Sequence, residues 1–238
     1  MDYKNFLTAL ESGEIRVAQK DSGEWRVDLS VKQGILEIFK NSRIVDIPGG
    51  FFDKELLMPR VFKSEDKVRI VPGGSSIRAG AYIGANVVIM PPSYVNIGAY
   101  VDDGTMIDSH VLVGSCAQIG RNVHLSAGVQ IGGVLEPIGY RPVIIEDDCF
   151  IGAGAVLVEG VLVRKKAVIA PGVVLSASIP IYDLTSDSVY KCEIPERSVV
   201  VPGSRNIKEQ INVNCAVIIK YRDEKTDLAL LFEDILRT

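Results

Sequence analysis

The sequence lacks any long apolar run: its 238 residues contain no stretch of 18 consecutive apolar side chains, so no transmembrane helix is expected. Its first residues, Met1 to Lys4, supply neither a basic n-region nor an apolar h-region, which predicts a cytoplasmic rather than a secreted protein. The 26 basic residues are outnumbered by 30 acidic ones, and a basic stripe typical of nucleic-acid binding is absent. We therefore expect neither a membrane nor a nucleic acid as a partner.

Cysteine and histidine are also scarce. The four cysteines form no CxxC pair, and Cys149 occupies a small-residue position of the repeat described below, which favours free buried thiols over disulfides. The two histidines, His110 and His124, are too few for a zinc site with three imidazoles and a bound water, so no metal is expected. Each histidine has two interpretations: a general base acting on a hydroxyl or amine, or a surface or interface residue.

What the sequence has in abundance is an aliphatic residue at every sixth position. The series breaks at Pro137 and restarts in a new phase at Ile145, and the position four residues further on in each hexad is small or β-branched. The aliphatic members are Ile77, Ile83, Ile89, Val95, Val101, Ile107, Val113, Ile119, Leu125 and Ile131, then Ile145, Ile151, Leu157, Val163, Ile169 and Leu175.

A six-residue period fits neither an amphipathic helix nor an alternating strand, and it indicates a repeat architecture. Short strands joined by corners would wind into a coil of triangular turns, with the aliphatic residue inward and glycine at corners that need a positive φ. The pattern resembles that of the hexapeptide-repeat acyltransferases. This resemblance implies an all-β-dominated fold, a left-handed parallel β-helix. The hand comes from the resemblance and not from the spacing.

The pattern divides the chain into three parts. We expect residues 1–76 to form a small α-rich N-terminal cap and linker, residues 77–203 to form the β-helix with excursions near 137–144 and 182–193, and residues 204–238 to form a C-terminal strand and helix. A cap at each end makes physical sense, because an open coil exposes unpaired backbone and apolar core.

Apolar spacing and turn residues predict particular elements within the two caps. In the N-terminal cap these are a helix over 3–12, a hairpin turning at 21–23, a second helix with a capping box of Ser30 and Gln33, and irregular chain over 43–76. In the C-terminal part they are a strand over 216–220 and a helix over 226–238.

Polar residues that break the pattern are the candidates for chemistry, because a core of valine and isoleucine has no reactive group. Asp108 takes the second position of its hexad and is either a corner residue bonded to its own backbone or a catalytic acid. Glu136 precedes the first excursion and is either a solvated acid or part of a site on that loop. Arg164, Lys165 and Lys166 form a basic corner that either lies in solvent or receives the phosphates of a nucleotide-like donor.

Several runs of this sequence resemble the tetrahydrodipicolinate N-succinyltransferases of bacterial lysine biosynthesis. The most specific are SYVNIGAYVD at 93–102, GTMID at 104–108 and VGSCAQIG at 113–120. The likeness continues at 122–126, 132–137, 144–152, 181–183, 197–203 and 215–219.

The resemblance implies transfer of a succinyl group from succinyl-CoA, as cosubstrate, to the amino group of open-chain 2-amino-6-oxopimelate, with no permanently bound cofactor. It also implies a homotrimer with active sites between neighbouring coils. Asp108 matches the acid that meets the substrate amine, Arg69 matches an arginine that binds a substrate carboxylate, and Glu136 matches an acid of the same pocket. A carboxylate suits an ammonium substrate, because it can hold the cation and accept the proton that must leave before attack on a thioester.

The sequence also departs from the family pattern. Ser109 and His110 stand where the family has Thr-Trp after the acid, and Gly154 and Val156 stand where many members have Arg and Glu. These departures lean towards the related N-acetyltransferases, so an acetyl donor is one alternative. A non-catalytic β-solenoid scaffold is another, against which the excursion and the out-of-pattern acids argue.

Overall fold

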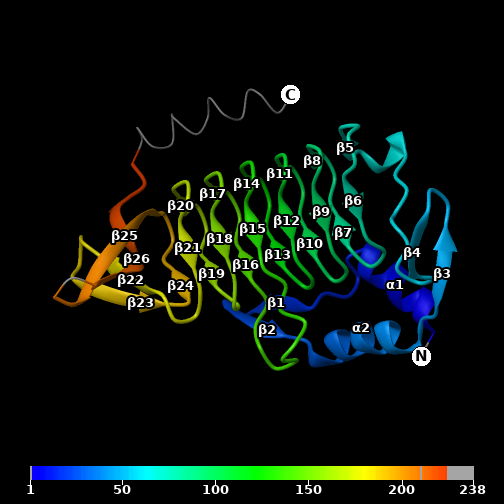
Figure 1. Ribbon diagram of the computed structural model, residues 1–238, viewed down its shortest axis with the longest axis horizontal. Helices are drawn as coiled ribbons and strands as arrows, with labels where there is room; N and C mark the ends of the chain where they lie inside the picture. Colours follow the sequence, from blue (N-terminus) through cyan, green and yellow to red (C-terminus); the bar gives the residue numbers. More distant parts are fainter. Residues whose placement is uncertain (1, 210, 224–238) are drawn as a thin grey trace.

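The structure, a computed structural model, describes residues 2–209 and 211–223. Its centre is a coil of short strands in which each turn adds one strand to each of three parallel sheets (Figure 1). Strands stack 18 positions apart, with residue 95 lying between residues 77 and 113. The six-residue period therefore gives a parallel β-helix with three hexads to a turn, as the sequence predicts.

The three sheets of the coil are numbered here. Sheet 1 consists of β7 (Tyr82–Ile83), β10 (Tyr100–Val101), β13 (Gln118–Ile119), β16 (Ile144–Ile145), β19 (Leu162–Val163) and β24 (Glu193–Ile194). Sheet 2 contains β5 (Arg69–Ile70), β8 (Val88–Ile89), β11 (Met106–Ile107), β14 (His124–Leu125), β17 (Phe150–Ile151) and β20 (Val168–Ile169), and four C-terminal strands extend it. Sheet 3 consists of β6 (Ser76–Ile77), β9 (Tyr94–Val95), β12 (Leu112–Val113), β15 (Gln130–Ile131), β18 (Val156–Leu157) and β21 (Val174–Leu175).

The interior of the coil is built from aliphatic ladders. In sheet 2, for example, Ile89, Ile107, Leu125 and Ile151 stack in register and have no exposed surface. Burying one such side chain stabilises the fold by roughly 1.5–3 kcal/mol. Because each ladder position repeats that gain, the hexad residues carry most of the driving force for coiling.

The coil tolerates an excursion without losing register. Leu125 pairs with Ile151 and Ile131 pairs with Leu157, so the separation grows from 18 to 26 positions where the chain leaves the coil between β15 and β16. The predicted excursion near 137–144 is therefore present. The boundaries of the coil differ from those expected: β5 already pairs with β8 before residue 77, and a long C-terminal strand runs through position 203.

The N-terminal cap consists of α1 (Tyr3–Glu11), the hairpin of β1 (Ala18–Asp21) and β2 (Glu24–Val27), and α2 (Leu29–Asn41). These elements match the prediction, but the capping box of Ser30 and Gln33 is wrong. The N-cap of α2 is Asp28, whose Oδ1 accepts hydrogen bonds from the backbone N–H groups of Ser30 and Val31. Ser30 lies inside the first turn, where a side chain cannot serve as the N-cap.

The cap covers sheet 1 and one row of corners. Leu10 and Ile35 of the two helices pack with Ile97 of the coil. Arg16 places its guanidinium 3.4 Å from the centre of the Tyr100 ring and donates from Nε to Oε1 of Gln118 at 3.1 Å. Neither helix in the described chain is long and apolar enough to span a membrane.

The segment after α2 is more regular than predicted. It contains a hairpin of β3 (Ile44–Ile47) and β4 (Phe51–Lys54), a 3-10 turn η1 (Ser64–Asp66), and then β5 and β6 of the coil. Gly49 and Gly50 both adopt positive φ at the hairpin turn. The Pro-Gly-Gly run that indicated an irregular chain is therefore the turn of a hairpin.

The C-terminal strands close the far end of the coil. β22 (Pro180–Asp183) and β23 (Ser188–Lys191) form the hairpin of the excursion predicted near 182–193. β25 (Ser198–Lys208) and β26 (Ile211–Tyr221) form a long antiparallel pair that extends sheet 2, and the strand predicted over 216–220 is part of β26. The helix predicted over 226–238 lies outside the described residues.

Two corner glycines offer a matched test of this packing. Gly160 and Gly154 both have positive φ, but a Cβ on Gly160 would lie 2.5 Å from the carbonyl oxygen of Arg141 in the excursion, whereas a Cβ on Gly154 would meet nothing within 4 Å. Both alanine variants lose roughly 1–2 kcal/mol to left-handed strain. We expect Gly160→Ala to lose about 1–3 kcal/mol more, because the excursion must shift. Urea unfolding measures both free energies, and equal losses would contradict the proposed close contact.

Candidate functional site

The coil has three rows of corners, named here by the sheets that they join: corners 1–2, 2–3 and 3–1. The candidate residues fall on different rows. Asp108 follows β11 at corner 2–3, Glu136 follows β15 at corner 3–1, and Arg164 to Lys166 follow β19 at corner 1–2. Because these rows are the three edges of a triangular prism, a single copy of the chain keeps the three groups apart.

Asp108 has the bonding of a corner residue. Its Oδ1 accepts a hydrogen bond from the backbone N–H of Ser109 at 2.7 Å, as Oδ1 of Asp102 does from Asp103 at 2.9 Å. Its carbonyl oxygen accepts a hydrogen bond from Oγ of Ser93 at 2.8 Å. Oδ2 has no hydrogen-bond partner in the described part of the chain. The corner bond therefore fixes the half-buried carboxylate and leaves one oxygen for a ligand.

A cavity of about 300 Å³ lies at the same row of corners, on the outer side of sheet 3. His110, Tyr94 and Gln130 line it, together with Ser93, the residue that holds the carbonyl of Asp108. His110 has a φ of 62° and donates its backbone N–H to the carbonyl of Pro92 at 2.9 Å. This corner therefore combines a fixed carboxylate with an imidazole, a phenol and an amide.

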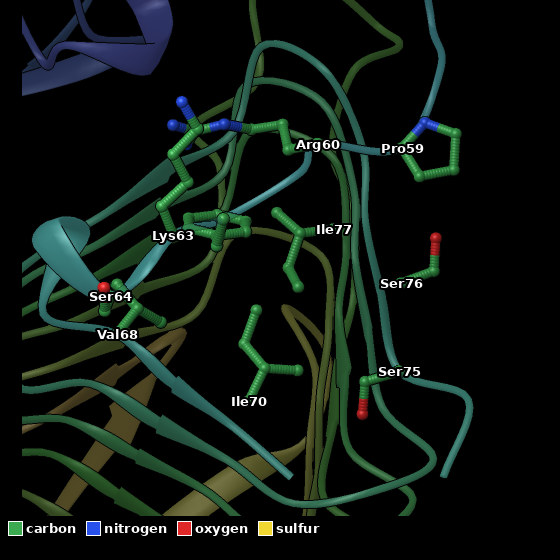
Figure 2. Close-up of a pocket in the computed structure, with 10 residues that line it drawn as sticks. Pro59, Arg60, Lys63, Ser64, Val68, Ile70, Ser75, Ser76 and Ile77 are labelled. Carbon is green, nitrogen blue, oxygen red and sulfur yellow. The ribbon is translucent and has the colours of Figure 1, made fainter. Parts of the chain in front are cut away.

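Arg69 is exposed on the first strand of sheet 2, where it stands in register with Val88 of the next turn and Met106 of the turn after that. A cavity of about 400 Å³ opens beside it at the end of the coil, and Figure 2 shows the side chains of Ile70 and Ile77 in this cavity. Arg69 does not line it.

Two cations line that end cavity, Arg60 and Lys63, and Arg60 is the one with buried contacts. Its Nη1 donates to the carbonyl of Ala81 at 2.6 Å, its guanidinium lies 4.6 Å from the centre of the Phe62 ring, and its Nε is 3.6 Å from Oε2 of Glu11 in α1. Burial lowers the pKa of Arg60, while Glu11 opposes that shift. Arg60 thus ties α1 to the open end of the coil, which is a structural role.

Glu136 is exposed at the start of the excursion, and no described residue forms an ion pair with it. The basic corner differs, because carboxylates already engage two of its three cations. Arg164 donates from Nε to Oε1 of Glu193 at 2.8 Å, and Nζ of Lys165 lies 3.8 Å from Oδ2 of Asp147. Lys166 has no carboxylate partner in the described chain, so it is the cation of this corner that is most open to an anionic ligand.

Glu146 is a buried carboxylate that contacts the basic corner. Its exposed fraction is 8%, and its carboxylate accepts hydrogen bonds from Nζ of Lys20 at 2.9 Å, Nε1 of Trp25 at 2.8 Å and the backbone N–H of Lys165 at 3.0 Å. Nη1 of Arg164 lies 3.4 Å away. Burial by itself would raise the pKa of Glu146, but the hydrogen bonds from Lys20, Trp25 and Lys165 outweigh it and hold the pKa below its ordinary value.

Within residues 2–209 and 211–223, no group of three or more His, Cys, Asp or Glu side chains could hold a metal ion. The four cysteines are free. Burial raises the pKa of the Cys116 thiol to about 12 and raises that of Cys149 as well, so these two thiols are poor nucleophiles.

Comparison with known proteins places this geometry in a family. A model described as the hexapeptide repeat of succinyl-transferase matches residues 142–177, and one described as the N-terminal part of tetrahydrodipicolinate N-succinyltransferase matches residues 3–40. A 2,3,4,5-tetrahydropyridine-2,6-dicarboxylate N-succinyltransferase of Wolbachia pipientis wMel is 50% identical over 241 residues, which cover 98% of this chain and 88% of that protein. The enzyme of the same name from the Wolbachia of Brugia malayi is 46% identical over the same shares.

The chain belongs to the tetrahydrodipicolinate N-succinyltransferase family. Its coil is accordingly the left-handed parallel β-helix expected from the resemblance. Among solved structures, the chain is similar to a putative 2,3,4,5-tetrahydropyridine-2-carboxylate N-succinyltransferase from Campylobacter jejuni, with a TM-score of 0.48, 14% identity, and coverage of 91% of this chain and 62% of that one.

Sequence reasoning missed two buried charges in this family member. Glu146 occupies the same hexad position as Asp108, but its donors Lys20 and Trp25 come from a hairpin more than 100 residues earlier. Lys32 of α2 has no exposed surface and contacts the excursion 108 positions later. The available signal was weak: an acid at the second hexad position marks a corner, but a pattern within the repeat does not reveal a partner from the cap.

The lowered pKa of Glu146 predicts a pH-dependent contribution to stability. Such a carboxylate stabilises the fold above the unfolded-state pKa of about 4.3, and the contribution is lost as the pH falls through the lower folded-state pKa. We expect Glu146→Gln to lower the free energy of unfolding by about 1–3 kcal/mol at pH 7, with the difference from wild type narrowing as the pH falls below about 4.3. Thermal and urea unfolding from pH 7 to pH 3 measure this gap.

The control is Glu196→Gln, because Glu196 is exposed and no described residue pairs with it. This variant should follow the wild-type curve at every pH. A gap between Glu146→Gln and wild type that stays constant down to pH 3 would show that packing, and not charge, accounts for the loss.

Proposed function

We propose that this protein transfers a succinyl group from succinyl-CoA to the amino group of tetrahydrodipicolinate in its open-chain form, 2-amino-6-oxopimelate, within the diaminopimelate route to lysine. The observation that carries this proposal is 46–50% identity, over 98% of the chain, to enzymes named for this reaction. The fixed, half-buried carboxylate of Asp108, on the same row of corners as the cavity lined by His110 and Tyr94, supports it independently.

The chemistry requires an acid at the substrate amine. The ammonium must lose a proton before its lone pair attacks the thioester carbonyl, and the C–S bond then breaks to release CoA, whose sulfur takes up a proton. Asp108 suits the first step because the Ser109 N–H holds Oδ1 while Oδ2 points to no described partner. Arg69 is proposed to bind a substrate carboxylate, which a planar guanidinium does in bidentate fashion.

The donor is proposed to meet the basic corner. Arg164 and Lys165 are held by carboxylates, so Lys166 is the side chain of this corner best placed to contact a CoA phosphate. The acetyl-donor alternative rests on Gly154 and Val156. Gly154 has a positive φ with open space at its Cβ, and Val156 lies half-buried on sheet 3. These positions therefore lack the charged groups that many relatives carry there.

The activity is tested by CoA release. We expect release from succinyl-CoA that depends on the cyclic imine substrate, with acetyl-CoA giving at least about tenfold lower kcat/KM. Asp108→Asn should lower kcat by about 100-fold or more, because the amine loses its proton acceptor, and should leave the melting temperature within the range of wild type. A higher kcat/KM with acetyl-CoA than with succinyl-CoA would identify acetyl-CoA as the acyl donor. An active but unstable Asp108→Asn would return Asp108 to a purely structural role.

We further propose that the protein works as a homotrimer whose sites lie between neighbouring coils. The support is geometric: Asp108 and Glu136 lie on different edges of one prism, so a site that uses both needs a second copy. In a cyclic trimer, each interface would join corner 2–3 of one copy to corner 3–1 of the next.

Complementation tests the shared site. Asp108→Asn and Glu136→Gln chains are each expected to be nearly inactive alone, whereas co-expressed chains in equal amounts should regain about one quarter of wild-type activity. That fraction follows because half of the sites receive an intact Asp108 and half of those receive an intact Glu136. Light scattering establishes the oligomeric state in parallel. A trimer that stays inactive after mixing would place both acids in the same chain's site.

A further inference from the structure

The excursion between β15 and β16 is held from outside the coil by a buried lysine. Lys32 of α2 has no exposed surface, and its Nζ donates a hydrogen bond to the carbonyl oxygen of Tyr140 at 2.5 Å. Figure 1 shows the excursion, in green, reaching beyond the coil beside β2 and the start of α2. The lysine therefore joins the cap to a loop that the hexad pattern does not otherwise restrain.

A charge in this position is costly. Removing an ammonium from water carries a penalty of several kcal/mol, and a neutral carbonyl offsets it only in part. Burial lowers the pKa of Lys32, and the Cys116 thiol opposes the shift. A buried methionine or leucine would fill the same space on α2 without that penalty. Packing therefore does not account for a lysine here, but its bond to the excursion does.

The remaining contacts show which part of the excursion Lys32 controls. Before Glu136, the backbone N–H of Val134 donates to the carbonyl of Ser115 at 3.2 Å, and Leu135 packs on the cap. After Tyr140, Arg141 donates from Nε to the carbonyl of Gly160 at 2.9 Å and from Nη2 to that of Cys192 at 3.0 Å. Residues 136–140 thus span two anchored points. Within the span, the backbone N–H of Tyr140 donates to the carbonyl of Pro137 at 3.0 Å and closes a turn, and the Lys32 bond attaches the end of that turn to the cap.

We propose that Lys32 is a positioning residue that fixes the conformation of residues 136–140, and through it the direction in which Glu136 projects at the subunit boundary. This inference rests on the proposed role of Glu136 in substrate binding. It assigns the cap a function in catalysis besides covering sheet 1, because α2 sets the geometry of a loop that carries an acid of the site.

Replacement of Lys32 by methionine tests this role. Lys32→Met keeps an unbranched apolar stem and removes the ammonium, so the melting temperature should stay equal or rise. The kcat/KM for the amine substrate should fall at least about tenfold, because a shift of about 1 Å in a site residue costs up to about 100-fold. Lys40→Met, at an exposed position of the same helix, is the matched control and should retain wild-type kinetics.

Two readouts separate positioning from general stability. In Lys32→Met, amide hydrogen exchange should accelerate at least about tenfold in peptides covering 137–143, with the strands of sheet 1 unchanged. The double variant Lys32→Met/Glu136→Gln should be no slower than Glu136→Gln alone, since both changes act through the same carboxylate. Losses that multiply, or exchange that rises throughout the molecule, would overturn the inference.

Failure of the proposed function would look different. Wild-type protein that releases no CoA, or Glu136→Gln with wild-type kinetics, would remove the role of Glu136. Hydrogen exchange would still report whether Lys32 fixes the excursion. If Glu136→Gln is impaired while Lys32→Met keeps full activity and unchanged hydrogen exchange, the positioning role of Lys32 is refuted and the proposed function stands.

Discussion

The stacking of one coil turn on the next is the constraint on which the whole structure depends. Each inward aliphatic residue must lie over the residue 18 positions away, because a shift by one position would turn core side chains outward. Besides its outward-facing strand residues, the chain can therefore vary in two ways. It can change the residue at a corner, or it can leave the coil and return in phase, as it does between Ile131 and Ile145. Asp108, Glu136 and the basic corner lie at these two kinds of place, whereas Arg69 lies on the outer side of a strand.

The cap obeys a different rule. Sheet 1 presents aromatic and aliphatic side chains outward, and the cap hairpin covers them with Trp25 and Val27 packed on Ile144 and Leu162. Burial of that face stabilises the contact between cap and coil, but it does little to fix where on the sheet the cap sits. The position of the cap is fixed by buried charges with short hydrogen bonds: Glu146 accepts from Lys20, and Lys32 donates to the excursion. Such bonds are strong only in one geometry, which suits an element that must seat in one register on a repetitive surface.

The fold was predictable because its dominant signal is local and repeated. Six-residue periodicity gave the strands, the corners and the excursion, and apolar spacing gave both cap helices. The errors arose where the signal was a single short run. Pro48-Gly49-Gly50 indicated a break but forms a hairpin turn, and Ser30 resembled an N-cap although Asp28 lies nearer the true helix start. The ends of the coil were misplaced for a related reason, because β5 enters without an in-phase hexad.

The candidate site was harder to predict, although part of its geometry is contained in the numbering. Once the eight residues of the excursion are subtracted, Asp108 and Arg164 occupy equivalent hexad positions eight hexads apart, and because eight is not a multiple of three they lie on different rows of corners. The numbering does not reveal which residue forms a hydrogen bond with each buried charged group. The two cap donors to Glu146, Lys20 and Trp25, and the acceptor of Lys32 lie more than 100 positions away, and hexad periodicity carries no information about them.

The separation of the corners has a mechanical consequence. A prism closed by three parallel sheets cannot fold one edge onto another, because any such bend would break hydrogen bonds in every turn. Asp108 and Glu136 therefore cannot meet by a hinge motion within one coil, which supports packing of a second copy as the way to combine them. Catalysis on such a frame relies on groups held in place before the substrate arrives. In the proposed mechanism, the Ser109 N–H holds Asp108 directly and the Lys32 ammonium acts on Glu136 through the carbonyl of Tyr140, so that each fixes an acid in advance on its own edge.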